Sequence, residues 1–427
     1  VVIAPGTYTE SVSSVRAGTS GSRITIDGLS APSVTIRSMT LRHPYITVKR
    51  ATISGNTTTY GSQFYLGRGA HFTRIENCVI NGNGALKVYG LNWEGPSTKP
   101  FGTDAASDCV ITGCTIKGVK AYPCVSMMGD RNVLENSSII DGTQVDFLRL
   151  WGRDNIIRLN TFNNNAIDNS LGNHPDFVQT FGNNGFGSTG HIIERNIVGN
   201  ALGAQLTQLE GNLIPDIRDW TVQNNIFHNI GLQASCTIPG MKYYNNVFYR
   251  CNIVNGGSAL NFGSRLYESR SVDDSSPSKA LVAFPIPSGS LVEGGAYKVY
   301  ANSSLTGTIT YDGTVYGDTD TFTATSVLTY TKSHTSVTVM RRMPNHAHNT
   351  DLRGNVFLEC GDGGWTKGWY SFSATYPLTG IVTDYNYVAG ALYAQKRPGT
   401  AVFGDPGWDF QKFYEPRAKM YDQLAAS

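Results

Sequence analysis

Residues 193–198 read IERNIV, and the same short unit returns along most of the chain, for example as VQNNIF (222–227) and LRGNVF (352–357). Aligned on their last apolar residue, the units place one polar column in register. It holds Asn160, Asn196, Asn225, Asn246, Asn355 and Asn386, and Cys78, Cys114 and Ser137 in the earlier units. Neighbouring members of the column are mostly 21 to 36 residues apart. Self-similarity at such intervals is typical of a solenoid with one unit in each coil.

The segments between the units show no apolar period near 3.6 residues, so each coil is predicted to consist of strands and turns. Stacked parallel strands lie about 4.8 Å apart, which lets Asn side chains in register hydrogen-bond from coil to coil. The predicted fold class is therefore all-β, a right-handed parallel β-helix, with the handedness taken from the crossover rule.

The repeat divides the chain into four predicted parts. Residues 1–265 are the first part of the β-helix and 346–410 are its last coils. Residues 278–343 interrupt the period with alternating Thr, Tyr and Val, which predicts the hairpins of a small inserted β-domain. Residues 411–427 have helical spacing and are expected to form a C-terminal cap. The opening strand, VVIAPGTYTESV (1–12), has nothing before it to cover it, which we interpret as a sign of a further N-terminal region upstream.

Composition and motifs argue against several classes of function. The net charge of +2 is too small to indicate nucleic-acid binding, and no apolar run approaches the roughly 18 residues of a membrane span. No phosphate loop, dinucleotide motif or nucleophile elbow is found. His346 and His348 share one side of a predicted strand without a third ligand, so no metal site is predicted. The seven cysteines include no CxxC pair and are predicted to be buried free thiols, which suits synthesis in a reducing cytoplasm.

A second strand follows each Asn unit and usually ends in Gly. Aligned on that Gly, these strands stack as GALKVYG (84–90), PCVSMMG (123–129), DFLRLWG (146–152), DFVQTFG (176–182) and QLTQLEG (205–211). Two alternating columns, which include Leu86, Leu148 and Leu150, are mainly apolar and are predicted to face inward.

The other two columns are then predicted to face outward. One holds Lys87, Ser126, Arg149, Gln179 and Gln208, and the next holds Tyr89, Met128, Trp151, Phe181 and Glu210. Aromatic faces pack on sugar rings, while Arg and Gln bind hydroxyls or carboxylates, so this face is predicted to be a sugar-binding groove. The predicted substrate-binding residues are Lys87, Tyr89, Trp151, Gln179, Phe181 and Gln208.

Asp146 and Asp176 fall in one column on adjacent coils, followed by Gln205, which predicts backbones about 5 Å apart. Two carboxylates this close cannot both ionise freely, and such a pair can hydrolyse a glycosidic bond. His174, Arg149 and Glu210 complete the candidate catalytic set. A structural reading stays open beside this one, because Asp often caps a turn and His-Pro often fixes an extended corner.

β-Elimination on a uronic acid is the alternative reaction. It would use Lys87, Arg149 or His174 as the base, and Arg or calcium to neutralise the carboxylate of the substrate. No cofactor is expected otherwise.

The Asn column, the opening VVIAPGTY (1–8) and the closing VFGDPGWDF (402–410) resemble the pectin-lyase-like β-helix superfamily over roughly residues 1–265 and 346–410. Residues 278–343 resemble modules of phage tail proteins. The resemblance implies a tailspike or related polysaccharide depolymerase, extracellular or virion-associated, and a homotrimer. Pectate-lyase, polygalacturonase and epimerase signatures do not match cleanly. The epimerase type has Asp-Pro-His, the opposite order to His174-Pro175-Asp176 here.

The expected function is binding and cleavage of a polysaccharide, with hydrolysis favoured over β-elimination. A non-catalytic protein that only recognises glycans is the rival interpretation.

Overall fold

The computed structural model describes residues 1–29, 33–171, 175–181, 185–210, 217–232, 234–236, 238–252, 258–263, 269–270, 282–287, 296–301, 304–310, 315–316, 319–322, 337–340, 349–358, 360, 368–373, 380–384 and 386–389. His174, His346, His348 and the predicted cap 411–427 lie outside these residues. A 3₁₀ helix, Asn169–Leu171, lies between the strands β17 (Thr161–Ala166) and β18 (Asp176–Phe181), and most of the other described elements are strands.

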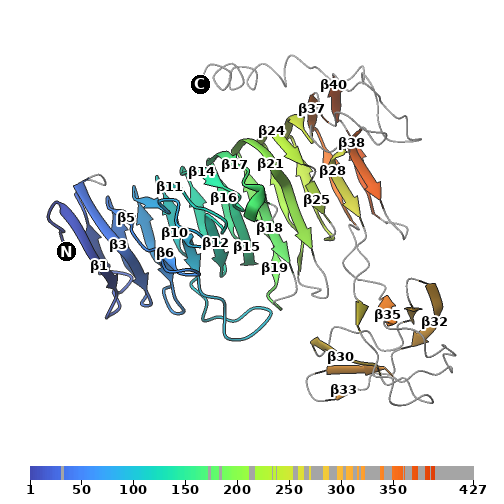
Figure 1. Ribbon diagram of the computed structural model, residues 1–427, viewed down its shortest axis with the longest axis horizontal. Helices are drawn as coiled ribbons and strands as arrows, with labels where there is room; N and C mark the ends of the chain where they lie inside the picture. Colours follow the sequence, from blue (N-terminus) through green and yellow to red (C-terminus); the bar gives the residue numbers. More distant parts are fainter. Residues whose placement is uncertain are drawn as a thin grey trace.

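Parallel strands stack along the long axis of the molecule in three ladders (Figure 1). The first ladder contains β2 (Ile24–Asp27), β4 (Ile46–Lys49), β7 (Arg74–Glu76), β10 (Val110–Thr112), β13 (Val133–Glu135), β16 (Ile156–Arg158), β20 (Ile192–Glu194), β23 (Thr221–Gln223), β26 (Lys242–Tyr244), β36 (Asp351–Arg353) and β39 (Val382–Asp384).

The second ladder follows the Asn column. It contains β1 (Gly6–Ser13), β3 (Val34–Leu41), β5 (Thr52–Ser54), β8 (Val79–Asn81), β11 (Thr115–Lys117), β14 (Ser138–Thr143), β17 (Thr161–Ala166), β21 (Ile197–Glu210), β24 (Ile226–Leu232), β27 (Val247–Cys251), β37 (Val356–Leu358) and β40 (Tyr387–Ala389).

The third ladder carries the predicted groove. It contains the last part of β3, then β6 (Ser62–Leu66), β9 (Tyr89–Trp93), β12 (Val125–Met128), β15 (Leu148–Arg153), β18 (Asp176–Phe181), the last part of β21, β25 (Ala234–Cys236), β28 (Ser258–Gly263) and β38 (Gly368–Ser373). Beyond the end of β15 the pairing continues through β19 (Ser188–Thr189) and β22 (Ile217–Arg218). These long parallel sheets confirm the predicted all-β class and are those of a parallel β-helix.

The Asn column is confirmed as a hydrogen-bonded ladder. The side-chain amide of Asn196 donates to the Oδ1 of Asn225 at 3.0 Å, and Asn225 donates to Asn246 at the same distance. Each of these Oδ1 atoms also accepts the backbone N–H of the preceding coil, so two buried donors are satisfied at every step. Ser137 holds the same place earlier, where its hydroxyl oxygen accepts the N–H of Cys114 at 3.1 Å.

Apolar side chains fill the space between the ladders. In the short strands of the first ladder the middle residue is buried and its two neighbours are partly exposed, as in β10, β13 and β16. A row of rings continues the core from coil to coil through Phe147, Phe162, Phe177, Phe227, Phe248 and Phe357, with centroids 4.8 to 5.9 Å apart. All seven cysteines are buried free thiols, as predicted.

Strands in the predicted insert, and β29 just before it, pair antiparallel, unlike those of the ladders. β29 (Ser269–Arg270), β35 (Val337–Met340), β31 (Ala296–Ala301) and β32 (Ser304–Thr310) form one sheet, and β30 (Val282–Pro287), β34 (Thr319–Phe322) and β33 (Val315–Tyr316) form another. Antiparallel pairing agrees with the hairpin pattern of the sequence. That residues 278–343 make up a separate domain stays a prediction.

Candidate functional site

One polar column crosses the third ladder in register. Ser126 of β12 pairs with Arg149 of β15, which pairs with Gln179 of β18, which pairs with Gln208 of β21. The predicted register of this column is confirmed, but two of its side chains are buried instead of facing solvent. Ser126 is 2% exposed and Gln179 is 9% exposed, whereas the side chain of Arg149 is 28% exposed, so Arg149 is the most accessible of the three.

The predicted places of Lys87 and Tyr89 in these columns are wrong. Asn92, not Lys87, pairs with Ser126, and Tyr89 pairs with Ser62 at the start of β6. Leu86, predicted to face inward, is 49% exposed. The error came from Gly90, which lies inside β9 rather than at its end. A Cβ there would meet the carbonyl oxygen of Cys124 at 2.5 Å, so this glycine permits close packing instead of ending a strand.

Asp146 and Asp176 share a column on adjacent coils, as predicted, and Gln205 follows Asp176 in register. The N–H of Asp176 donates to the Oδ1 of Asp146 at 3.1 Å, which ties the two coils together. Asp146 is 3% exposed and Asp176 is fully buried. Both carboxyl groups therefore lie beneath the surface instead of projecting into solvent.

Arg149 links this buried acid to the surface. Its Nε–H donates to the Oδ2 of Asp146 at 2.6 Å, and its guanidinium carbon lies 5.7 Å from the centre of the Phe181 ring. The side chain of Arg149 is 28% exposed. Its two terminal nitrogens have no hydrogen-bond partner within the described parts of the chain, so they are available to a ligand.

Tyr89 and Tyr122 lie close enough to Arg149 to feel its charge, and Tyr60 contacts Tyr122. The sequence analysis had identified only Tyr89. The Tyr122 ring lies 4.5 Å from Tyr89, edge to face, and 5.5 Å from the more exposed Tyr60. Burial, followed by the charge of Tyr122, raises the pKa of Tyr89 to about 12. Burial and then the charge of Tyr60 raise the pKa of Tyr122, against the lowering effect of Arg149. Both phenols thus stay protonated at neutral pH.

Gln179 adds an acceptor beside Arg149. Its Oε1 is buried and has no hydrogen-bond partner among the residues that the structure describes. A buried amide oxygen without a donor costs free energy, which a ligand hydroxyl or N–H would recover. Tyr60, Tyr89, Tyr122, Asp146, Arg149 and Gln179 are called the Arg149 site below.

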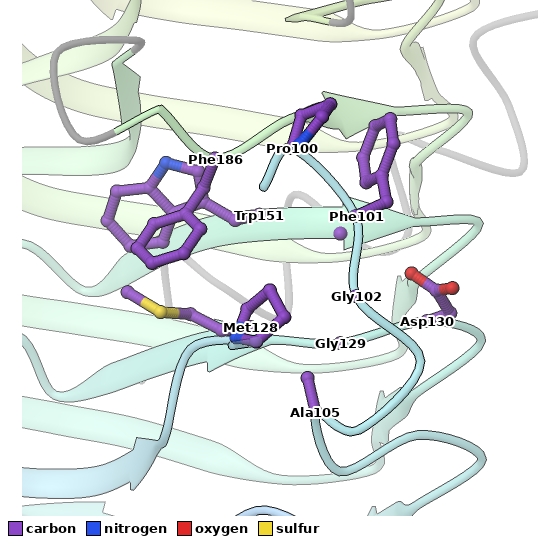
Figure 2. Close-up of a pocket in the computed structure, with 11 residues that line it drawn as sticks. Pro100, Phe101, Gly102, Ala105, Met128, Gly129, Asp130, Trp151 and Phe186 are labelled. Atoms are coloured by element: carbon purple, nitrogen blue, oxygen red, sulfur yellow. The ribbon is translucent and has the colours of Figure 1, made fainter. Parts of the chain in front are cut away.

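The predicted row of exposed aromatic residues is only partly present. Trp151 is 2% exposed, so it is not a surface platform. Its indole N–H donates to the carbonyl oxygen of Phe181 at 3.2 Å, and the two rings meet edge to face at 5.1 Å. Phe181 is partly exposed and keeps a place at the surface. Trp151 is buried because the chain between β9 and β10 crosses above it (Figure 2).

For Gln208 and Glu210 the structure describes the backbone only. The backbones of Gln208 and Glu210 lie in β21, in register with Gln179 and Phe181. His174 lies outside the described residues, two positions before the start of β18. The described residues contain no cluster of three or more metal-ligating side chains. No helix among them is long and apolar enough to cross a membrane.

The Arg149 site can bind an anionic group. A guanidinium held by a carboxylate through Nε presents its remaining N–H donors in a planar fork, the geometry that suits a second carboxylate. The phenols beside it can donate hydrogen bonds or protons, and their rings can pack on the face of a sugar.

No family model matches the chain, and no curated protein matches it by sequence. Among solved structures, the PL6-family alginate lyase AlyGC aligns at 13% identity and a TM-score of 0.40, over 94% of this chain and 50% of its own. The A-module of the Azotobacter vinelandii mannuronan C-5 epimerase AlgE4 aligns at 10% identity and 0.34, over 93% and 91%. The enzymatically active domain of bacteriophage CBA120 tailspike protein 2 aligns at 13% and 0.33, over 56% and 35%.

The chain spans 50% of the length of the Agl-KA catalytic domain, 50% of AlyGC and 35% of the tailspike protein 2 domain. The alignments with AlyGC, AlgE4 and the tailspike domain have identities of 13% or less and TM-scores of 0.40 or less. They assign neither a substrate nor a reaction to this chain.

Proposed function

We propose that the chain binds an acidic polysaccharide across β12, β15 and β18 and cleaves it at the Arg149 site. The observation that carries this proposal is the arrangement of Arg149, which is anchored through Nε to the buried Asp146 and partly exposed at its other end. An anchored guanidinium has lost much of its freedom before a ligand arrives, so binding a carboxylate costs less entropy.

The same arrangement supports β-elimination better than hydrolysis. A general acid or nucleophile must reach the glycosidic bond, but Asp146 and Asp176 are 3% and 0% exposed. Both oxygens of Asp146 also hold partners, Arg149 and the N–H of Asp176. In β-elimination these acids need not touch the sugar. Arg149 would neutralise the uronate carboxylate, which makes the neighbouring C–H more acidic.

Proton transfer in this scheme falls to groups near Arg149. Tyr122 is partly exposed and protonated, and it would donate a proton to the leaving oxygen. His174, two residues before Asp176 in sequence, would be the base that removes the proton from carbon. Its role stays a prediction from the sequence.

Hydrolysis stays the second candidate because Asp146 and Asp176 are in contact on adjacent coils. Such a pair would need both carboxyl groups to become accessible when the polysaccharide binds. The predicted homotrimer and extracellular or virion-associated location belong to the proposal as well.

A panel of neutral and uronic-acid polysaccharides tests the reaction, with reducing ends and the ultraviolet absorbance of unsaturated products read together. We expect both signals to rise with a uronic-acid polymer. Reducing ends without absorbance would support hydrolysis instead. Binding without either signal would support a protein that only recognises glycans.

Arg149→Gln tests the residue itself. The variant should lose roughly a hundredfold in kcat/KM on the acidic polymer, the effect of removing a charged hydrogen-bonding partner. Arg158→Gln is the matched control, because Arg158 forms a similar pair with Glu135 at 2.7 Å on the first ladder. Equal activity of the two variants would contradict the proposal.

A further inference from the structure

A small pocket lies beside the Arg149 site, under the segment that connects β9 to β10 (Figure 2). Pro96, Pro100, Phe101, Gly102 and Ala105 of this segment form one wall. Met128 at the end of β12, Gly129 and Asp130 after it, and Trp151 of β15 form the floor, and Phe186 covers one side. Gly152 also lines the pocket. We call it the strap pocket.

The strap pocket is closely built and largely apolar. Trp151 and Ala105 are 2% and 1% exposed. A Cβ on Gly95 would meet the Phe186 ring at 2.7 Å, so the ring can lie here only because residue 95 has no side chain. The one ionisable side chain in the lining, Asp130, is bound to Arg153 through two hydrogen bonds of 3.0 and 2.5 Å.

The space inside suits a methyl group. The cavity volume is about 10 Å³, close to the space of one small probe sphere. A water molecule in this space needs two to four polar partners, whereas the lining is largely apolar and its one carboxylate is bound to Arg153. An apolar group needs none and gains by leaving water.

The position of the strap pocket connects it with the proposed substrate. Trp151 follows Arg149 by two residues on the same strand, a displacement of roughly 7 Å. Two cations lie near its cover: the Nζ of Lys99 is 4.7 Å from the Phe186 ring, and the guanidinium of Arg153 is 5.0 Å from Phe101. The charge of Arg153 is compensated by Asp130, so Lys99 is the cation that would attract an anionic polymer to this rim.

We propose that the strap pocket receives the methyl of an O-acetyl group carried by the sugar at Arg149 or by its neighbour, so that the protein prefers an acetylated acidic polysaccharide. A uronic acid carries its carboxylate where a 6-deoxy sugar carries a methyl, so a methyl on such a residue comes from a substituent. The inference rests on the proposed function, because it needs the polymer to lie across Arg149.

The test compares an acetylated acidic polysaccharide with the same polymer after mild alkaline removal of its acetyl groups. For the natural sequence we expect deacetylation to lower affinity and kcat/KM roughly tenfold, the lower end of what an apolar pocket discriminates. Phe186→Ala removes the cover and Ala105→Leu fills the cavity, so in both variants the two polymers should differ less than twofold. Affinity is measured separately, so each variant gives a result even if cleavage is slow.

Phe72→Ala is the matched control, because Phe72 is an exposed ring stacked on Tyr45 away from the strap pocket. It should keep the full preference. Equal use of both polymers by the natural sequence would overturn the inference and leave the proposed function standing, whereas no binding or cleavage of either would overturn both. If a polymer with 6-deoxy sugars kept its affinity after deacetylation and lost it in Phe186→Ala, the acetyl assignment would be overturned.

Discussion

The Nε–H of Arg149 donates to the Oδ2 of Asp146 at 2.6 Å, and the other carboxylate oxygen of Asp146 accepts the N–H of Asp176 from the next coil at 3.1 Å. One buried carboxylate therefore positions a partly exposed cation and joins two coils. This interpretation gives Asp146 a positioning role, where the sequence had suggested a catalytic one. It also explains why Asp146 and Arg149 are three residues apart across the start of β15.

Asp146→Asn should weaken binding of the acidic polysaccharide more than it changes the fold. Asn keeps an oxygen for the N–H of Asp176 but no longer holds the guanidinium by charge. We expect affinity to fall roughly tenfold, equivalent to about 1.4 kcal/mol. Arg149 is 28% exposed and can be solvated, so the loss of stability should be only about 1 kcal/mol. Titration with the polymer and thermal unfolding measure the two effects.

Glu135→Gln serves as the control for that variant. Glu135 pairs with Arg158 on the first ladder, and its removal should leave affinity unchanged. If Asp146→Asn abolished cleavage while binding stayed intact, Asp146 would have to act on the substrate directly.

Asn225→Ala should be strongly destabilising. The Oδ1 of Asn225 accepts both the backbone N–H and the side-chain amide of Asn196, and its amide donates to Asn246 and to the carbonyl of Ile193. Alanine leaves several of these buried groups without a partner, at about 1–3 kcal/mol each. We expect a total loss of roughly 3–5 kcal/mol in urea unfolding.

Gln223→Ala, two residues earlier, is the comparison for the Asn ladder. Gln223 is partly exposed and bonds Glu194 at 2.8 Å, so its loss should cost under about 1 kcal/mol. Similar losses for the two variants would mean that the Asn ladder adds little to stability.

Tyr122→Phe tests the proposed proton donor. The ring contacts with Tyr60 and Tyr89 survive, and only the hydroxyl is lost. The expected result is a fall in kcat of about a hundredfold with little change in KM, the size of a general-acid contribution. Tyr45→Phe is the control, because the Tyr45 ring stacks on Phe72 away from the Arg149 site. Its kcat and KM should equal those of the natural sequence. A change in KM alone would make Tyr122 a binding residue.

The Asn column could be predicted from sequence because a single residue type repeats at one place in every coil. The interior requires this repetition, since each buried amide must find its partner in the neighbouring coil. The stacking of Asp146 on Asp176 was predictable for a related reason. Both stand the same number of residues before a glycine that ends its segment.

Other features depend on where intervening chain packs, which no local pattern encodes. Gly90 and Gly152 look alike in sequence, but Gly90 is the second residue of β9 and Gly152 is the second-last residue of β15, so Lys87 and Tyr89 were placed in the wrong register. Trp151 was predicted to be exposed, but it is buried because Pro100, Phe101 and Phe186, from distant parts of the sequence, pack around it. Tyr60 and Tyr122 join the Arg149 site through turns whose lengths vary between coils.

His191→Asn should flatten the dependence of stability on pH. His191 is fully buried beside Trp220, and it continues a second column in which Asn132 and Asn155 accept the N–H of the preceding coil. Its Nδ1 accepts the N–H of Asn155 at 3.2 Å, so the proton is on Nε2, which lies 3.0 Å from the hydroxyl of Ser188. Burial lowers the pKa of His191 to about 3. The folded protein thus holds a neutral ring that the unfolded chain protonates near pH 6.5.

The sign follows from proton binding. Between about pH 6.5 and 3 the unfolded state binds a proton at residue 191 that the folded state excludes, so stability is full above this window and falls as the pH falls. The slope approaches about 1.4 kcal/mol per pH unit below pH 6, and Asn at this position removes it. Urea unfolding of the natural sequence and of His191→Asn from pH 7 to 4.5 measures the difference in slope. Burial also lowers the pKa of His228, but this residue is present in both proteins and its effect cancels. Parallel curves, or a His191 ring that titrates near pH 6 by NMR in the folded protein, would mean that water reaches this side chain.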